Sequence, residues 1–201
     1  VMWVLFGYSL SFAPSGNAFI GDFRWLGLEG VSLTEGYTDD ASIPNMVFSA
    51  FQMMFAVITP ALITGAVAGR MKFKSIFVFT IFWSLIVYYP LAHMVWGQGG
   101  LLGADGIGAL DFAGGDVVHI SSGVSALVLC ILLGKRHDYE HSIYRIHNIP
   151  TVVLGASLLM FGWFGFNAGS ALAADGLAAH AFMTTGVSAA AAMLSWMLCD
   201  I

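Results

Sequence analysis

The feature that most constrains this fold is a series of long apolar runs separated by short polar segments. One run, within Ala109–Arg136, begins after Asp111, carries His119 and is otherwise almost wholly apolar as far as Leu133. A helix of that length can cross the roughly 30 Å hydrocarbon core of a bilayer. The chain is 58% hydrophobic and 9% charged, with mean hydropathy +0.83, whereas a soluble domain is about 25% charged. We therefore expect an all-α, polytopic membrane protein.

Turn residues and charges divide the chain into six expected membrane spans within one domain, residues 1–201. The expected spans cover about residues 1–13, 45–69, 75–96, 111–134, 149–174 and 180–198. Pro60 lies inside the second span, a position that packed membrane helices tolerate. Because the chain opens and closes within apolar runs, we expect it to be a fragment of a longer protein.

The basic residues predict the orientation of these spans. Of seven Lys and Arg, three lie in the segment 70–74 and three in the segment 135–145, with Arg24 as the exception. If the spans alternate, both segments lie on one side, and the positive-inside rule places that side in the cytoplasm. We expect a multi-pass protein of the cell membrane, either a plasma membrane or a bacterial inner membrane. The sequence contains no basic stripe of the kind that would bind nucleic acid.

Two ionisable residues of the fourth expected span are candidates for function. Asp111 would lie at the outer mouth, with His119 two turns inward and about 80° away around an ideal helix. An ionisable group at membrane depth is costly, so it favours a transport path or a proton relay. The alternatives are a helix N-cap for Asp111 and a core histidine, bonded to a backbone carbonyl, for His119.

Aromatic side chains form a second group of candidates. Phe51 and Phe55 are one helical turn apart, Trp96 ends the third expected span, and several aromatic residues at 161–166 precede Ser170. Aromatic faces attract cations within about 6 Å, although aromatic residues are also common at membrane interfaces.

The sequence does not favour chemistry on a covalent substrate. No nucleophile-elbow pattern surrounds a serine, and no Gly-Lys-Ser/Thr loop is present to hold a phosphate. The histidines lack metal-ligand spacing, and both cysteines are isolated in apolar runs. We expect no enzyme activity, no metal site and no cofactor.

Four motifs, in the same order and at plausible separations, resemble those of the ammonium transporter family (Amt/Mep/Rh). They are PSGNAFIGD at 14–22, HMVWG at 93–97, DFAGGDVVH at 111–119 and GWFGFNAGS at 162–170. Because Trp96 and Ser170 are both present, the chain resembles the Amt branch more than the Rh branch. The resemblance covers the whole chain and implies a fragment of an eleven-helix fold, similar to helices two to seven. That fold contains two five-helix halves related by an inverted repeat, and it assembles as a homotrimer with one pore per subunit.

The resemblance also implies roles for the aromatic residues. Phe51, Trp96 and Ser170 would form an outer ammonium site, with cation–π contacts and a hydroxyl acceptor. Phe55 and Phe166 would be the stacked rings that close the pore below this site.

For the ionisable residues, the resemblance implies that Asp111 supports the cation site and holds the local backbone. His119 would be the first of two pore histidines, and its partner would belong to the tenth helix, which this sequence does not contain. A hydrophobic, histidine-lined pore would favour ammonia over sodium or potassium, because deprotonation removes the charge.

Other functions stay open from the sequence. The chain could belong to an ammonium sensor of a membrane signalling protein, or to an unrelated proton-coupled carrier that uses Asp111 and His119. An intramembrane enzyme is the most distant alternative. A regulatory protein of the PII class is an expected cytoplasmic partner, facing the basic segments 70–74 and 135–145, which also read as ordinary positive-inside residues.

Overall fold

The computed structural model describes residues 1–14, 17–104, 106–136, 139 and 146–200, and the chain folds as two compact units. The units are Val1–Ser142 and Ile143–Ile201. Throughout the described residues, the regular elements are helices, and the β contacts amount to an isolated bridge between Gly36 and Pro44. In the part of the chain that the structure describes, five helical stretches are long and apolar enough to cross a membrane: Asn45–Val67, Phe73–Trp96, Gly115–Leu133, Ile149–Gly169 and Gly176–Cys199. The apolar helix Trp3–Phe12 is shorter.

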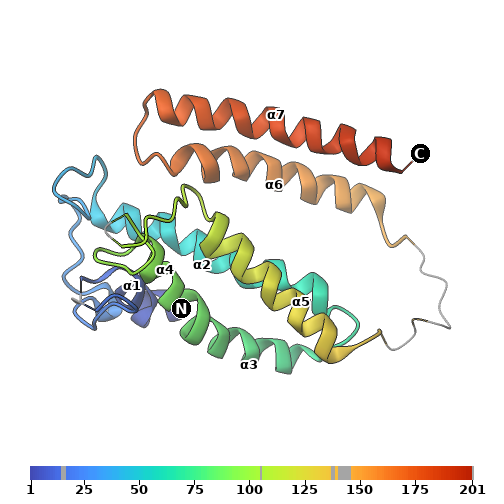
Figure 1. Ribbon diagram of the computed structural model, residues 1–201, viewed down its shortest axis with the longest axis horizontal. Coiled ribbons are helices and arrows are strands. Elements are labelled where there is room, and N and C mark those ends of the chain that lie inside the picture. The colour runs from blue at the N-terminus through green and yellow to red at the C-terminus, as the bar shows by residue number, and fades with distance from the viewer. Residues whose placement is uncertain (15–16, 105, 137–138, 140–145, 201) are drawn as a thin grey trace. The chain divides into compact units, whose positions relative to one another are not determined.

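Within its described residues, the first unit contains nine helical elements, three of which are π segments (Figure 1). They are η1 (Trp3–Gly7), α1 (Tyr8–Phe12), η2 (Leu26–Leu28), α2 (Asn45–Val67), α3 (Phe73–Trp83), η3 (Ser84–Tyr88), α4 (Tyr89–Trp96), η4 (Gly115–Ile120) and α5 (Ser121–Leu133). The segment η3 joins α3 to α4 in one continuous span, and η4 runs directly into α5. The two main packing contacts place α2 against α5 and α1 against α4.

Helix α2 presents one buried face to the interior of the first unit. Its buried residues recur every three or four positions, which is the spacing of a single helix face. They are Asn45, Phe48, Ser49, Gln52, Phe55, Thr59, Ile63 and Val67. Half of this face is polar, so the interior of the unit depends on hydrogen bonds as well as on apolar packing.

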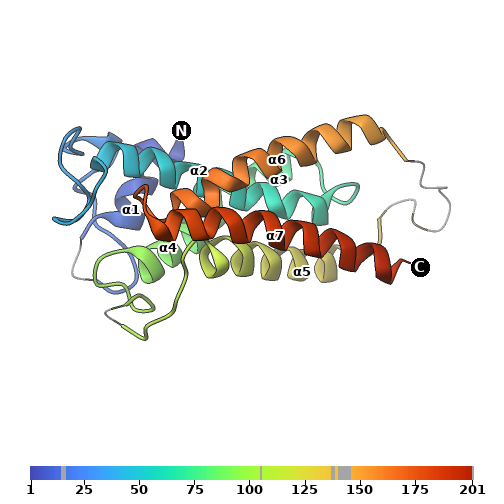
Figure 2. The same ribbon diagram turned by 90° about the horizontal axis from the view of Figure 1, so that it is seen from above.

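The second unit is an antiparallel pair of helices, α6 (Ile149–Gly169) and α7 (Gly176–Cys199) (Figures 1 and 2). Each helix begins after a polar N-cap. The Asn148 side chain accepts from the Thr151 amide at 2.9 Å, and the Asp175 carboxylate accepts from the Ala178 amide at 2.9 Å. These caps explain where the helices start, because they satisfy backbone donors that have no partner within the helix.

The structure corrects one geometric expectation and shifts several bounds. Asp111 precedes the helix, which begins at Gly115, so the expected 80° helical angle between Asp111 and His119 does not apply. The last helix begins at Gly176 rather than near 180, because Asp175 caps it. Residues 15–16 of the first motif and much of the expected basic segment 135–145, Arg145 included, lie outside the described residues.

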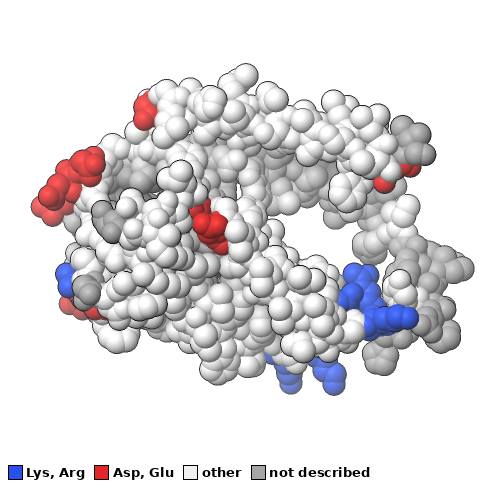
Figure 3. Space-filling model, in the orientation of Figure 1, with Lys and Arg blue, Asp and Glu red and all other residues white. Residues whose placement is uncertain are grey.

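Charge is distributed unevenly over the first unit (Figure 3). Five of its six described basic side chains gather where α2 meets α3 and where α5 ends: Arg70, Lys72, Lys74, Lys135 and Arg136. Arg24 lies in the acidic loop 17–44 and pairs with Asp22, the nitrogen and oxygen being 2.7 Å apart. The positive-inside rule would put the basic end of this unit in the cytoplasm.

Candidate functional site

The Asp111 carboxylate is held by four backbone amides at the start of η4. Its Oδ1 accepts from the amides of Gly114 and Gly115 at 2.5 and 2.8 Å, and its Oδ2 accepts from those of Asp116 and Val117 at 2.8 and 2.9 Å. A carboxylate at this position complements the positive end of the helix. The capping alternative for Asp111 therefore matches the structure, and the four bonds fix the backbone of the DFAGGDVVH motif.

The first of the two adjacent glycines is required by this geometry. Gly114 has φ +100°, and a Cβ at this position would lie 2.6 Å from Val118 Cγ2. A Cβ at Gly115 would meet nothing within 4 Å. Gly114 thus lets the chain turn sharply into η4 while four amides converge on one carboxylate.

Three of the predicted aromatic and acidic site residues meet around Trp96. The Trp96 indole Nε1 donates to the Asp111 carbonyl oxygen at 2.9 Å. The Phe55 ring lies edge-on to Trp96, with 5.7 Å between the ring centroids, and the Phe51 centroid lies 4.9 Å from that of Phe55. Phe55 is buried, whereas Phe51, Trp96 and Asp111 are partly exposed. The structure therefore brings Phe51, Phe55, Trp96 and Asp111 together. We call Phe51, Phe55 and Trp96 the aromatic cluster; Asp111, which caps η4, lies beside it.

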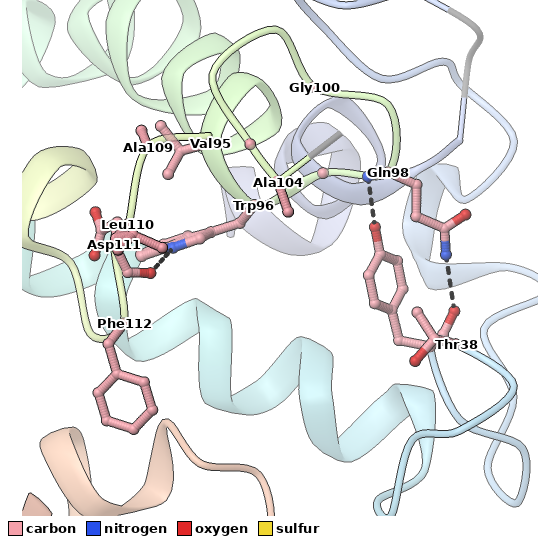
Figure 4. A pocket seen from close by; sticks show the side chains of 13 residues that line it. Thr38, Val95, Trp96, Gln98, Gly100, Ala104, Ala109, Leu110, Asp111 and Phe112 are labelled. Atoms are coloured by element: carbon pink, nitrogen blue, oxygen red, sulfur yellow. Dashed lines mark hydrogen bonds between the residues drawn. The ribbon is translucent and has the colours of Figure 1, made fainter. Parts of the chain in front are cut away.

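A pocket of about 520 Å³ opens beside this cluster (Figure 4). Its lining includes Trp96 and Asp111, together with Tyr37 and Gln98. The Gln98 amide donates to Tyr37 Oη at 3.2 Å, and the Gln98 side chain donates to the Tyr37 carbonyl at 3.3 Å. Burial raises the pKa of Tyr37 to about 12, so its hydroxyl is neutral at physiological pH. The sequence did not predict that Tyr37 and Gln98 line this pocket. They are 61 residues apart, and no motif or spacing links them.

Two histidines of the first unit, His93 and His119, lie in opposite environments. His93 is fully buried; its Nδ1 lies 3.1 Å from the Ser11 carbonyl oxygen and its Nε2 lies 2.8 Å from that of Asn17. The His119 side chain is exposed on η4. The core histidine bonded to backbone carbonyls, considered for His119, is thus found at His93. Gly97 permits this arrangement, since a Cβ there would lie 2.6 Å from His93 Nδ1.

The remaining predicted site residues belong to the second unit. The Ser170 hydroxyl donates to the Phe166 carbonyl at 2.8 Å, so its hydrogen is used and its oxygen lone pairs stay available to a donor. The Phe166 ring stacks on Trp163, with centroids 4.9 Å apart. The association of Ser170 and Phe166 with the aromatic cluster stays a prediction.

Taken with the apolar helices, these features define a polytopic helical membrane protein with a capped, aromatic-lined site. Comparison with known proteins agrees, because residues 1–201 match the sequence profile of the Ammonium Transporter Family. The chain belongs to this family.

Two relatives and one solved structure illustrate the likeness. The ammonium transporter of Bacillus subtilis (strain 168) is 52% identical over 200 residues, a match that covers 100% of this chain and 48% of the relative. Ammonium transporter 1 of Dictyostelium discoideum is 44% identical over 200 residues, covering 98% and 43%. The crystal structure of Saccharomyces cerevisiae Mep2 matches with a TM-score of 0.87 and 39% identity, over 99% of this chain and 44% of that one. The chain spans about half the length of the relatives it matches.

Proposed function

We propose that the protein containing this chain transports ammonium or ammonia across the membrane, and that this chain supplies the outer recruitment site. Membership of the Ammonium Transporter Family supports transport rather than enzyme chemistry. The observation that carries the proposal is the aromatic cluster, in which Trp96, Phe55 and Phe51 lie together and the Trp96 indole is fixed by the backbone of Asp111.

The first step is recruitment of the cation at the outer face. An ammonium ion loses hydration when it leaves water, and aromatic faces replace part of that lost stabilisation. Trp96 and Phe51 offer such faces, and Ser170 offers a hydroxyl oxygen whose own hydrogen is already donated to Phe166. The Asp111 carboxylate, held by four backbone amides, keeps in place the Asp111 carbonyl that accepts from Trp96, and its negative charge would attract a cation.

The second step is passage of the neutral molecule below this site. Phe55 and Phe166 would close the pore with their rings, and the exposed side chain of His119 would face the path beyond them, as one of two pore histidines. An apolar passage rejects sodium and potassium because these ions cannot lose their charge, whereas ammonium can release a proton.

Assembly and regulation are further parts of the proposal. We infer a homotrimer with one pore per subunit, and a PII-class regulatory protein as a partner at the basic end of the first unit. A role as an ammonium sensor is the alternative function, and it would use the same outer site without net transport. An unrelated proton-coupled carrier would depend on Asp111 and His119 but not on Phe51, Trp96 or Ser170.

The test is uptake of ammonium and methylammonium by liposomes that contain the full-length protein. We expect saturable uptake, altered about tenfold by Trp96→Leu, which removes the largest cation–π face, and altered also by His119→Ala. Trp196→Leu is the matched control, because Trp196 is exposed on α7 and lies outside the proposed site. Binding of ammonium without any uptake would favour the sensor. Uptake that is indifferent to Trp96→Leu would favour the unrelated carrier.

A further inference from the structure

The side chain of Tyr37 attaches the acidic loop 17–44 to the segment that follows α4. The Tyr37 hydroxyl oxygen accepts from the backbone amide of Gln98 at 3.2 Å (Figure 4). The Gln98 side chain donates to the Tyr37 carbonyl oxygen at 3.3 Å. Gln98 lies two positions after Trp96, the last residue of α4. The pair of bonds therefore holds the backbone that directly follows Trp96.

The same tyrosine also contacts α1 and α2. Its hydroxyl donates to the Phe12 carbonyl oxygen at the end of α1, 3.1 Å away. Its ring stacks on Phe48 of α2, with centroids 4.8 Å apart and an angle of 10° between the ring planes. Burial raises the pKa of Tyr37 to about 12, so the hydroxyl keeps the hydrogen that it donates at physiological pH. Tyr37 thus connects its loop with three segments of the first unit.

Two of these segments carry rings of the aromatic cluster. Phe48 lies on α2 about one helical turn before Phe51. Trp96 ends α4, and its indole nitrogen is fixed separately by the bond to the Asp111 carbonyl oxygen. The stack on Phe48 and the bond to Gln98 therefore join the helix that carries Phe51 to the segment that carries Trp96.

We propose that Tyr37 is a positioning residue that sets the separation between the Trp96 and Phe51 rings. The proposal rests on the proposed function, in which these two rings hold the ammonium ion at the outer site. Cation–π attraction depends on the distance between the ion and each ring. A displaced Trp96 would therefore hold the ion less tightly, although Tyr37 itself does not touch it.

The hydroxyl of Tyr37 can be removed without releasing the loop. Trp25, in the same loop, stacks on Tyr8 of α1, with centroids 5.4 Å apart and an angle of 16° between the planes. Tyr37→Phe leaves this second anchor in place, keeps its own ring and deletes only the oxygen. Because Gln98 is exposed, its amide can bond to water instead. We therefore expect Tyr37→Phe to fold, with the turn after α4 no longer tied to the loop by this bond.

The test uses the full-length protein labelled with 5-fluorotryptophan. The fluorine NMR line of Trp96 is identified by its loss in Trp96→Leu. Ammonium chloride is titrated into the protein, with sodium chloride at equal concentration as the reference salt, and the shift of this line reports binding. Tyr8→Phe is the matched control, because it also deletes one buried hydroxyl, but that hydroxyl donates to Asn45 Oδ1 rather than contacting the segment after α4.

We expect Tyr37→Phe to move the Trp96 line even without ammonium. It should also raise the ammonium concentration at half-titration about threefold to tenfold, the range expected for loss of one hydrogen bond. In liposomes, the KM for ammonium should rise by the same factor while kcat is preserved. Tyr8→Phe should leave the Trp96 line and the KM unchanged. Adding Tyr37→Phe to Trp96→Leu should not raise the KM further, because the first residue acts through the second.

An unchanged Trp96 line in Tyr37→Phe would overturn the proposal. So would equal effects of Tyr37→Phe and Tyr8→Phe, or a further rise of the KM when Tyr37→Phe is added to Trp96→Leu. If ammonium fails to move the Trp96 line of the unmodified protein, the outer recruitment site of the proposed function is wrong. The ammonium-free spectra would still decide whether Tyr37 positions Trp96.

Discussion

The two units of this chain hold their polar groups in different ways. In Val1–Ser142, side chains contact backbone atoms far away in sequence, as the ring nitrogens of His93 do with the carbonyl oxygens of Ser11 and Asn17, 82 and 76 residues away. In Ile143–Ile201, the side chains that cap α6 and α7 bond three residues along the same segment, and Asn167 donates to Thr185 across the pair at 2.9 Å.

This difference indicates how each unit could serve the proposed transport. The first unit fixes Trp96 by a hydrogen bond to Asp111 and packs the Phe55 ring against Trp96, so the geometry of the aromatic cluster depends on contacts between separate segments. The second unit orients Ser170 and Phe166 by their place on one helix. We therefore expect substitutions of buried polar groups to be far more damaging in the first unit, and the following predictions can break or sharpen that contrast.

The largest effect is expected at the Asp111 cap, which is compared here with the Asp175 cap of the second unit. Asp111→Ala leaves four amides without their acceptor, and hydrogen bonds to a charged group contribute about 1.5–3 kcal/mol each without full additivity. We expect a loss of about 4 kcal/mol in the free energy of unfolding, together with loss of uptake. Asp175→Ala removes one amide partner and should cost about 1 kcal/mol. Unfolding of the purified full-length protein in detergent measures both.

Equal losses at Asp111 and Asp175 would contradict the contrast between the units. Asp111→Asn refines the experiment, because the amide keeps its shape but has one oxygen instead of two. If Asp111→Asn retains stability and still loses uptake, the negative charge matters for the cation rather than for the backbone.

The next effect concerns the two histidines. His93→Ala removes a fully buried ring together with both of its carbonyl contacts, and we expect it to destabilise the protein by about 3 kcal/mol. His119→Ala removes an exposed side chain and should change stability by less than about 0.5 kcal/mol. Uptake should nevertheless change in His119→Ala. The pair therefore separates a structural histidine from a transport histidine, and a stability loss at His119 as large as that at His93 would refute the separation.

These histidines also show what the sequence can and cannot predict. The apolar runs predicted the membrane helices, and the motifs predicted that Trp96 and Asp111 belong to one site. Periodicity could not show that His93 is the buried histidine, because its partners are carbonyl oxygens of Ser11 and Asn17, which carry no side-chain signal. It also placed Asp111 inside a helix, since an apolar run continues through the turn that Gly114 makes.

The smallest effects on stability are expected from alanine substitutions of glycines, which can be compared in both units. Gly114→Ala places a Cβ 2.6 Å from Val118 Cγ2 at φ +100°, and we expect it to cost about 2 kcal/mol. Gly115→Ala, one residue later, should instead be neutral or stabilise η4 by up to about 1 kcal/mol, since no atom lies within 4 Å of its Cβ.

Gly186 on α7 supplies the control in the second unit. A Cβ there would lie 3.5 Å from Phe164 Cε1, an ordinary contact, so Gly186→Ala should be tolerated and slightly favourable for helix formation. Thermal unfolding of the three alanine variants ranks them directly. If Gly186→Ala is as harmful as Gly114→Ala, close packing rather than the cap at Asp111 limits both units. If only Gly114→Ala is harmful, the turn that gathers four amides on one carboxylate is the strict requirement.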